Sequence, residues 1–336
     1  MTKVGIIGAG SWGTALAILL NNNGHDVTIW SYKQEEIDML KNEHEHKTKL
    51  PNVKLPYSMN FTTNLEEAVR NKDFIVMAVP SHAVRSTARK IKDYVSENQI
   101  IVDVAKGIEE TTLMTLSQQI EEEIPQANVA VLSGPSHAEE VGRNIPTIVA
   151  IGAKDEKTAT YLQEMFMSET FRVYVTSDML GMELGGSLKN VIALAAGIAD
   201  GLGYGDNTKA ALITRGIREI AQLGVAMGGH PDTFNGITGV GDLIVTCASK
   251  HSRNRKAGYL IGQGLTMQEA MDEVHMVVEG VYSTKAAYEL GKKYGVDLPI
   301  INEVYSVLFE NKNAAESVKE LMLRNNKTEY FAREWN

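Results

Sequence analysis

A lysine stands in an almost wholly apolar stretch of the sequence, ELGGSLKNVIALAAGIADG, which covers residues 183–201. If this stretch is helical, Lys189 shares its face mostly with small residues. The larger side chains of Val191, Leu194 and Ile198 lie on the opposite face. A row of small residues on one helix face allows another chain segment or a ligand to approach the backbone closely. Two interpretations follow: the lysine reaches out to water where two helices cross, or it belongs to a functional site.

A glycine-rich segment near the N-terminus, GIIGAGSWGTALA, has the G-x-G-x-x-G spacing of dinucleotide-binding loops. It follows an apolar strand pattern and opens a helical one. Gly8 permits the tight turn, Gly10 lets the backbone approach a pyrophosphate, and Gly13 lets helix and strand pack closely. The free amides of the helix N-terminus then bind the pyrophosphate. The segment predicts NAD or NADP binding; the alternative is a strand–turn–helix that is merely rich in glycine.

The end of the second strand indicates which dinucleotide is bound. NAD enzymes usually place an acidic residue there for the ribose hydroxyls. Here the strand ends TIWSYKQ, so that Ser31, Tyr32 and Lys33 stand where the acid would be. No carboxylate at these positions repels a 2′-phosphate, and Lys33 could attract one. We therefore expect NADP(H) to be accepted and preferred, unless Lys33 simply projects into solvent.

Polar residues follow the fourth and fifth predicted strands. VDVAKGI ends with Lys106, and LSGPSHAEE carries Gly134, Ser136 and Ala138. In open α/β sheets ligands bind beyond the carboxyl ends of the strands, so these residues are candidates for a binding site. An alternative role for Ser136 is to cap the helix that begins at HAEE.

The second half of the chain has its clearest polar cluster in GVGDLIVTCASKHSRNRKAG, residues 239–258. Asp242 and Thr246 are four positions apart and share a helical face. Ser252 is placed to cap a following helix, which begins with Arg253 and Asn254. A helix N-terminus with an arginine at its start suits a phosphate group. The alternative is a solvated basic turn.

The length of 336 residues suits two domains. Apolar runs in the first half predict strands that alternate with helices, at 3–8, 26–30, 73–79, 99–105, 128–134, 147–153 and 171–175. Such alternation predicts an α/β Rossmann-type doubly wound sheet in residues 1–178. Helical patterns dominate residues 179–336, which we expect to form an all-α domain, at 178–200, 207–227, 253–263, 266–272, 281–294 and 299–309.

Composition narrows the class of protein. Cys247 is the single cysteine, which excludes a disulfide within the chain and suits a reducing, cytoplasmic location. The net charge of −9 argues against a nucleic-acid partner. There is no secretory signal pattern and no apolar run long enough to span a membrane. The polar stretch 41–49 is expected to be a surface loop.

Taken together, the motifs resemble the bacterial NAD(P)-dependent sn-glycerol-3-phosphate dehydrogenase family. The similarity covers essentially the whole chain in order, through GAGSWGTALA, VAKGIE, LSGPSHAEEV, ELGGSLKNVIALAAGIADGLGYGDN, GVGDLIVTC, HSRN and VVEG. It implies reversible reduction of dihydroxyacetone phosphate to sn-glycerol 3-phosphate with NADP(H) or NAD(H) and no metal. It also implies a small phosphorylated substrate, a role in supplying the glycerophosphate of phospholipids, and a homodimer.

The resemblance also assigns residues. Lys189 is the proton acceptor, and substrate contacts are implied for Lys106, Gly134, Ser136, Lys189, Asp242, Ser252, Arg253 and Asn254. Cofactor contacts are implied for Ser11, Trp12, Lys106, Ala138, Arg253, Val277 and Glu279. Tyr32 and Lys33 fall in the adenosine-phosphate region, where family members vary. The loop 41–56 departs from the family in part, because many relatives have a tyrosine where Lys49 stands.

The implied chemistry is physically reasonable. A lysine can take the hydroxyl proton, or return it to a developing alkoxide, if its pKa falls from about 10.4 toward neutrality. Partial burial and the nearby Lys106 would both lower it. Asp242 could orient the ammonium group, in a cleft between the two domains. Two rivals stay open: a 3-hydroxyacid dehydrogenase of similar build, and a dinucleotide sensor without catalysis.

Overall fold

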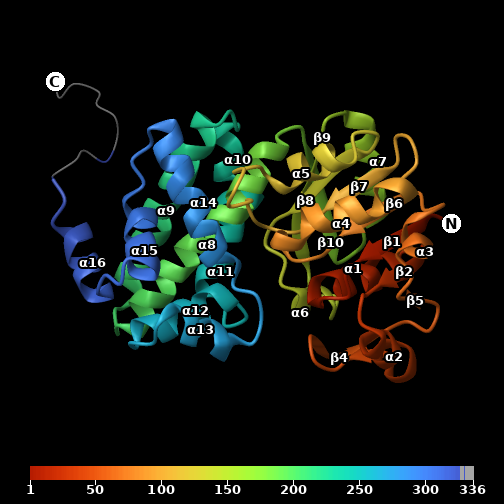
Figure 1. Cartoon of the computed structure of the whole chain (residues 1–336), viewed down its shortest axis with the longest axis horizontal. Helices are drawn as coiled ribbons and strands as arrows, with labels where there is room; N and C mark the ends of the chain where they lie inside the picture. Colours follow the sequence, from red (N-terminus) through yellow and green to blue (C-terminus); the bar gives the residue numbers. More distant parts are fainter. Residues whose placement is uncertain (326–328, 330–336) are drawn as a thin grey trace.

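A computed structural model describes residues 1–325 and Glu329. Eight strands form one sheet in the first half of the chain, in the spatial order β10-β9-β8-β7-β6-β1-β2-β5 (Figure 1). Their bounds are β1 (Lys3–Ile7), β2 (Asp26–Trp30), β5 (Asn60–Thr62), β6 (Phe74–Met77), β7 (Ile100–Asp103), β8 (Asn128–Ser133), β9 (Thr147–Ala153) and β10 (Phe171–Thr176). The apolar runs predicted all of these except β5, which is only 3 residues long.

The strand order reverses next to β1, which lies between β6 and β2. This reversal leaves a crevice at the carboxyl ends of β1 and β6, the usual place for a ligand in such sheets. In the spatial order, the six strands β8-β7-β6-β1-β2-β5 all pair in parallel, as expected for a Rossmann-type sheet. Strand β9 is antiparallel to β8, so the series of βαβ units is interrupted between these two strands. Strand β10 pairs with β9 in parallel after the helix at Glu156–Phe166, which gives one further βαβ unit. The link before β9 carries only the 4-residue helix α6 (Ala138–Val141), not a crossover helix.

Helices cover both faces of the sheet. Alternate strand residues point to opposite faces, so Ile6 packs in one apolar cluster and Ile7 in another. The first cluster includes α1 (Ser11–Asn22) and α7 (Glu156–Phe166). The second includes α4 (Val84–Ile91) and α5 (Leu116–Glu123). Two further helices complete this half, α2 (Gln34–Glu43) and α3 (Leu65–Val69).

The prediction of a surface loop at residues 41–49 is wrong in part. Helix α2 continues to Glu43, and a two-stranded ribbon of β3 (Glu45–His46) and β4 (Leu50–Lys54) follows. His46 and Leu50 are buried. The sequence of this ribbon is rich in charged residues and has no apolar strand pattern, so a strand was not predicted there. The ribbon is held by contacts to α2 and to the glycine loop.

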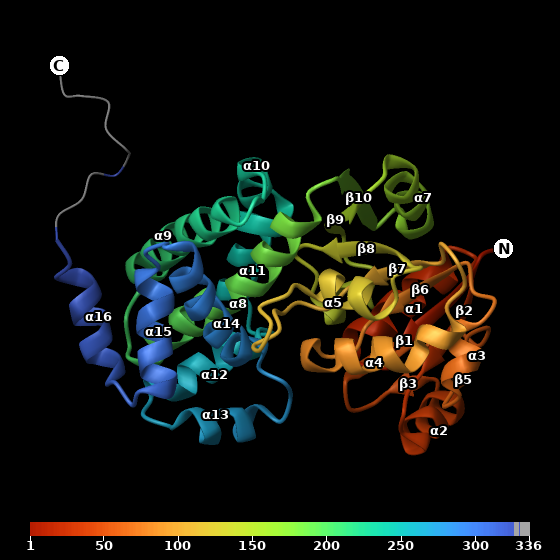
Figure 2. The ribbon, with the colours of Figure 1, turned by 45° about the horizontal axis from the view of Figure 1, so that its top comes forward.

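A bundle of helices forms the second half, with α8 (Met179–Gly201) in its centre (Figure 2). Asp178 caps α8 by accepting a hydrogen bond from the Gly181 amide at 2.9 Å. Beyond β10 the described residues contain no strand. The other helices are α9 (Asp206–Ala226), α10 (Pro231–Asn235), α11 (Asp242–Ala248), α12 (Arg253–Gly262), α13 (Met267–Val274), α14 (Glu279–Tyr294), α15 (Pro299–Phe309) and α16 (Ala314–Met322).

Helix α8 is buried along almost its whole length, which explains its lack of charge. The small residues beside Lys189 allow close approach of two other elements. A Cβ at Gly185 would lie 2.6 Å from the Thr238 carbonyl, and a Cβ at Gly186 would lie 2.9 Å from Ser133 Oγ. Ser133 ends β8, so this face of α8 meets the carboxyl edge of the sheet. None of the described helices is long and apolar enough to cross a membrane.

Candidate active site

Two lysines share one carboxylate where the sheet meets α8. The ammonium group of Lys189 donates a hydrogen bond to Asp242 Oδ1. Lys106 Nζ lies 2.7 Å from Asp242 Oδ2 and donates a second hydrogen bond, at 2.9 Å, to the Gly134 carbonyl. Residues from both halves of the chain therefore meet in one cluster, which brings together four of the substrate-site residues predicted from sequence.

Asp242 is placed by an unusual turn. It begins α11 directly after a π-helical segment, η3 (Ile237–Gly241), and such segments are frequent at functional sites. Thr246 lies one turn further on, as the spacing predicted. Lys189 donates to Thr246 Oγ1 at 2.7 Å, while the Thr246 hydroxyl donates to the Asp242 carbonyl at 2.6 Å. Thr246 therefore holds the lysine directly, a role that the sequence analysis did not assign.

Burial sets the charge state of this cluster. Lys189 is 5% exposed and Asp242 is 1% exposed, which excludes the interpretation that Lys189 reaches out to water. Burial lowers the pKa of Lys189 to about 7, with Asp242 opposing this shift and Lys106 adding to it. Burial alone would raise the pKa of Asp242, but the ammonium groups of Lys106 and Lys189 lower it below its usual value. The lysine is thus poised to exchange a proton near neutral pH.

The Gly134 carbonyl is held from two sides. Ser136 Oγ donates to it at 2.9 Å, in addition to Lys106. Gly134 has φ +144, and a Cβ there would lie 3.0 Å from Val149 Cα, so the turn after β8 requires glycine. The alternative role of Ser136 as a helix cap is wrong, because α6 begins at Ala138 and its N-cap residue is His137.

The HSRN segment forms the start of α12. Ser252 caps it, as predicted, by accepting a hydrogen bond from the Arg255 amide at 3.2 Å. Arg253 is exposed at the first helical position. Asn254 is buried: its Nδ2 donates to Asn190 Oδ1 at 2.9 Å, and its Oδ1 accepts from the Gly280 amide at 2.8 Å. Asn254 therefore ties α12 to α8 and α14, next to Lys189.

The glycine loop has room for a pyrophosphate. Gly8 has φ +120, and a Cβ there would lie 2.7 Å from the Ala78 carbonyl; a Cβ at Gly13 would collide with the Gly8 carbonyl. A Cβ at Gly10 would meet nothing within 4 Å, so the space over this residue is open. Gly10 also precedes the first residues of α1, Ser11 and Trp12, whose helix N-terminus favours an anion. This loop fits a dinucleotide.

A carboxylate does lie at the end of β2, although not at the expected positions. Ser31 Oγ donates to Glu36, which also pairs with Lys49. His46 Nε2 lies 3.1 Å from Glu36 Oε1 and 2.9 Å from the Ala9 carbonyl in the glycine loop. Burial alone would raise the pKa of Glu36, but hydrogen bonds from His46, Lys49 and Ser31 lower it to about 2. The assumption that this edge lacks a carboxylate is therefore wrong, and Lys49 balances the charge of Glu36.

The two residues predicted for the adenosine end are both exposed. Tyr32 is 74% exposed, and Lys33 Nζ lies 5.5 Å from the centre of the Tyr32 ring. They stand directly after β2 and are open to a ligand on that edge.

The VVEG motif links the two halves. Glu279 begins α14 and accepts hydrogen bonds from the Ser81 amide, at 3.2 Å, and from the Ser81 hydroxyl. Ser81 lies in a short turn, η1 (Ser81–Ala83), that follows β6. Burial raises the pKa of Glu279, although the bonds from Ser81 oppose the shift. Val277 lies just before this helix, in a segment that is not a strand.

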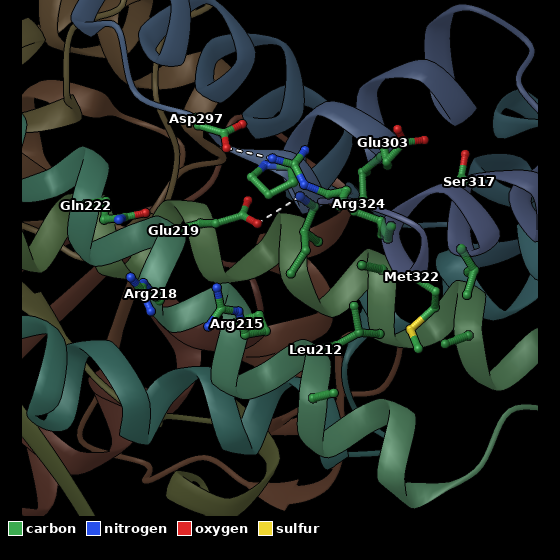
Figure 3. Close-up of a pocket in the computed structure, with 18 of the residues that line it drawn as sticks. Leu212, Arg215, Arg218, Glu219, Gln222, Asp297, Glu303, Ser317, Met322 and Arg324 are labelled. Carbon is green, nitrogen blue, oxygen red and sulfur yellow. Dashed lines mark hydrogen bonds and ion pairs between the residues drawn. The ribbon is translucent and has the colours of Figure 1, made fainter. Parts of the chain in front are cut away.

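A large groove lies away from these residues. It has a volume of about 1720 Å³ and runs between α9, α15 and α16. Figure 3 shows Arg215, Arg218 and Glu219 of α9 on one side of it. None of the predicted site residues lines it. Within residues 1–325 and Glu329, no group of three or more His, Cys, Asp or Glu residues could hold a metal ion.

Comparison with known proteins gives the family. Residues 3–159 match the family "NAD-dependent glycerol-3-phosphate dehydrogenase N-terminus", and residues 178–319 match the corresponding C-terminus. A glycerol-3-phosphate dehydrogenase [NAD(P)+] from Agathobacter rectalis is 65% identical over 335 residues, covering 100% of both chains. The Bacillus subtilis protein of the same name is 50% identical over 327 residues, covering 96% of this chain and 95% of its own.

Solved structures agree with this result. A glycerol-3-phosphate dehydrogenase from Coxiella burnetii has a TM-score of 0.93 at 36% identity, covering 96% of this chain and 99% of that one. A ketopantoate reductase from Ralstonia eutropha shares the fold more distantly, with a TM-score of 0.61 at 15% identity, covering 96% of this chain and 100% of its own. The chain therefore belongs to the NAD-dependent glycerol-3-phosphate dehydrogenase family.

Proposed function

We propose that this chain is an NAD(P)H-dependent enzyme that reversibly reduces dihydroxyacetone phosphate to sn-glycerol 3-phosphate. The observation that carries the proposal is the buried cluster of Lys189, Asp242 and Lys106 at the carboxyl edge of the sheet. Names of close relatives support the choice of substrate and cofactor. A bound nicotinamide dinucleotide would donate the hydride in reduction and accept it in oxidation.

Lys189 acts as the general acid in reduction and as the general base in oxidation. Its pKa of about 7 allows both roles near neutral pH. Asp242 and Thr246 hold the ammonium group in one orientation, since both bond to Nζ. Lys106, fixed by Asp242 and the Gly134 carbonyl, stabilises negative charge on the substrate oxygen.

The phosphate of the substrate binds at the start of α12. Arg253 can hold two phosphate oxygens with its planar guanidinium group, and the helix N-terminus adds amide donors. Ser252 and Asn254 build this helix start, and Gly134 and Ser136 form the facing edge of the site.

The cofactor would be held by Gly8, Gly10 and Gly13, together with Ser11, Trp12 and Ala138 at the nearby helix starts. Val277 and Glu279 would contact it from the other half of the chain. We expect NADP(H) to bind at least as tightly as NAD(H), because Lys33 and Lys49 supply positive charge at the end of β2. Fluorescence titration with each reduced cofactor measures this preference.

The deciding experiment is substrate-dependent loss of NADPH absorbance. Dihydroxyacetone phosphate is expected to be reduced rapidly, and a 3-oxo acid is not. Rapid reduction of the 3-oxo acid would favour the 3-hydroxyacid dehydrogenase. Cofactor binding without any turnover would favour the sensor.

Arg253→Ala tests the phosphate site. We expect a loss on the order of 2 to 4 kcal/mol in kcat/KM for dihydroxyacetone phosphate, because a charge-assisted pair is removed. Arg253→Lys should lose less, since it keeps the charge without the planar fork. The slow reduction of dihydroxyacetone, which lacks the phosphate, is the control. Equal losses for both substrates would show that Arg253 supports the fold or the cofactor.

Further parts of the proposal concern the cellular setting. We place the domain boundary between residues 178 and 179, where β10 gives way to α8. We also propose a cytoplasmic homodimer without a nucleic-acid partner, which supplies glycerophosphate for phospholipids. Light scattering on the purified protein measures the oligomeric state.

A further inference from the structure

His137 has an unused polar atom in the site. It lies between Ser136 and Ala138, at the N-cap position of α6, but its side chain does not cap that helix. Its Nε2 is buried, and no hydrogen-bond partner for it exists among the described residues. A buried polar atom without a partner is costly, unless a ligand or water satisfies it.

A second histidine faces His137 from the other half of the chain. The ring centres of His137 and His251 lie 5.8 Å apart, with their planes tilted by 55°. His251 directly precedes Ser252, the cap of the helix that begins with Arg253. The free nitrogen of His137 is therefore at the phosphate end of the site, between the sheet edge and α12.

The charges around His137 come from three elements besides His251. Lys189 lies on α8 and Lys106 follows β7, while Glu139 and Glu140 belong to α6 itself. Burial and the two lysines lower the pKa of His137 below its usual 6.5, and the two glutamates oppose the shift only partly. Without an anion in the site, His137 is therefore neutral at pH 7. A phosphate dianion beside it would offset the two lysines and favour its protonated form.

We propose that His137 is a further substrate-binding residue, which donates a hydrogen bond from Nε2 to the substrate phosphate and takes up a proton when the phosphate binds. This rests on the proposed function of the site. His251 limits the rotation of the His137 ring by packing against it, so it acts as a positioning residue. Arg253 and His137 then hold the phosphate from opposite sides of the cleft.

Two substitutions separate hydrogen bonding from protonation. His137→Phe removes both, and His137→Asn keeps a side-chain N–H donor but cannot take up a proton. His230→Asn is the matched control, because the His230 side chain caps α10 outside the cleft and Asn can cap as well. Thermal unfolding of each full-length variant checks that it is folded.

The first measurement is the KM for dihydroxyacetone phosphate at saturating NADPH between pH 5.5 and 8.5. In His137→Phe we expect KM to rise by roughly tenfold to a hundredfold, the effect of a hydrogen bond to a charged group, with kcat changed far less. In His137→Asn the rise should be small at high pH and grow as the pH falls, because only the wild type gains a charged donor there. His230→Asn should follow the wild type throughout.

The second measurement is proton uptake on binding. Calorimetric titration of sn-glycerol 3-phosphate into the protein with NADPH gives no turnover, and repeating it in buffers of different ionisation enthalpy counts the protons. Wild type and His230→Asn should take up more protons than His137→Asn. Since the ligand itself titrates in this range, the difference between variants is the result that matters.

Three outcomes would overturn the assignment. One is a pH profile of KM in His137→Asn that coincides with the wild type. Another is equal proton uptake by the two proteins. A third is an equal loss of kcat/KM for dihydroxyacetone in His137→Phe, which would show a contact outside the phosphate. Failure of the proposed function looks different, because the wild type itself would then not reduce dihydroxyacetone phosphate.

Discussion

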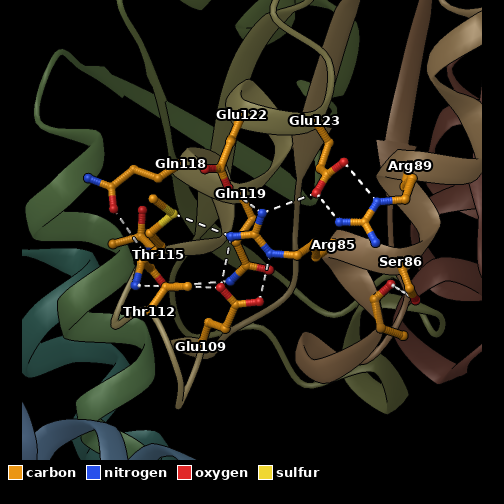
Figure 4. Close-up of polar contacts among 12 residues, drawn as sticks. Arg85, Ser86, Arg89, Glu109, Thr112, Thr115, Gln118, Gln119, Glu122 and Glu123 are labelled. Atoms are coloured by element: carbon orange, nitrogen blue, oxygen red, sulfur yellow. Dashed lines mark hydrogen bonds and ion pairs between the residues drawn. The ribbon is translucent and has the colours of Figure 1, made fainter.

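Lys106 and Glu109 are three positions apart in the loop after β7, yet they belong to two charge clusters with opposite properties. Lys106 shares Asp242 with Lys189, where the carboxyl edge of the sheet meets α8. Glu109 binds Arg85 of α4, together with two glutamates of α5 (Figure 4). Comparing the two clusters shows what distinguishes a candidate site for proton transfer from an ion pair that joins elements of the fold.

The Arg85 cluster holds its charges firmly. Arg85 donates to both carboxylate oxygens of Glu109, at 2.7 and 2.8 Å, and to Glu123 at 3.1 Å. Glu122 adds a third carboxylate. Arg85 thus faces three carboxylates at a partly exposed position, and Arg89 adds a second cation at Glu123. The bonds to Glu109 raise the pKa of Arg85, and the bond from Arg85 lowers the pKa of Glu109, so neither group changes charge near neutral pH.

In the cluster of Lys106, Lys189 and Asp242 two cations share one carboxylate, whereas carboxylates outnumber cations in the Arg85 cluster. The cluster at Asp242 is also far more buried. Burial disfavours charge on Lys189, and Asp242, which also faces Lys106, opposes this shift only in part. The pKa of Lys189 therefore falls to about 7. Both clusters contain ion pairs, so an ion pair alone does not indicate a shifted lysine pKa. The two clusters differ in the ratio of cations to carboxylates and in how far they are buried from water.

The largest effect is expected for Lys189→Ala. Removing the proposed general acid–base group should lower kcat by at least about a hundredfold, the lower end of the range for such groups. Cofactor binding should persist, since Lys189 lies on α8 and not on the glycine loop. Steady-state assays and a fluorescence titration with NADPH measure the two properties. Turnover close to that of the wild type would mean that the low pKa of Lys189 has no catalytic use.

The pH dependence of turnover gives a second, smaller effect. Neutral Lys189 accepts a proton, so oxidation of sn-glycerol 3-phosphate should rise as the pH increases through about 7, and reduction should fall over the same range. In Asp242→Asn the carboxylate that raises the pKa of Lys189 is lost. The inflection in the oxidation profile should then move to lower pH, with a lower maximum rate.

Arg85→Met is the control for the pH profile, because it removes the cation that joins the three carboxylates of the other cluster. An unmoved inflection in Asp242→Asn, or a moved one in Arg85→Met, would contradict the assignment of the titration to Lys189.

Much of this arrangement could be predicted from the sequence. Apolar runs located the strands from β6 to β8, and an uncharged pattern located α8. The polar residues at strand ends, Lys106 among them, were recognised as candidates because ligands bind at that edge. The spacing of Asp242 and Thr246 correctly placed both on one face.

Other features depend on contacts that no local pattern encodes. Lys106 and Asp242 are 136 positions apart, so their pairing, and with it the lowered pKa of Lys189, is a property of the folded chain. The Glu36 cluster was missed because its partners come from the short β3–β4 ribbon, whose sequence is polar. Strand β9 has the same apolar pattern in either direction, and its antiparallel pairing depends on the link from β8.

A substitution in the Arg85 cluster should lower the stability of the protein without lowering its activity. Arg85→Met leaves Glu109, which is 20% exposed, without its main cation, and leaves Glu123, which is 13% exposed, with Arg89 as its remaining partner. We expect the free energy of unfolding to fall by about 1 to 3 kcal/mol, less than for a fully buried pair because water reaches this one. Urea unfolding measures the loss. The kcat at a temperature well below unfolding should stay near that of the wild type, and a large decrease would connect this cluster to the site.

The smallest effect is expected for Arg89→Ala, in the same cluster. Arg89 is 62% exposed, and its partner Glu123 keeps the bond from Arg85 when Arg89 is removed. Solvent screening and side-chain entropy make such pairs weak, so the loss should be clearly smaller than that of Arg85→Met. Urea unfolding of Arg85→Met, Arg89→Ala and the double variant completes a double-mutant cycle, in which the shared carboxylate should make the two losses non-additive. If Arg89→Ala destabilises the protein as much as Arg85→Met, exposure does not determine the strength of these pairs. The contrast between the partly exposed cluster and the buried site would then have to rest on the ratio of charges alone.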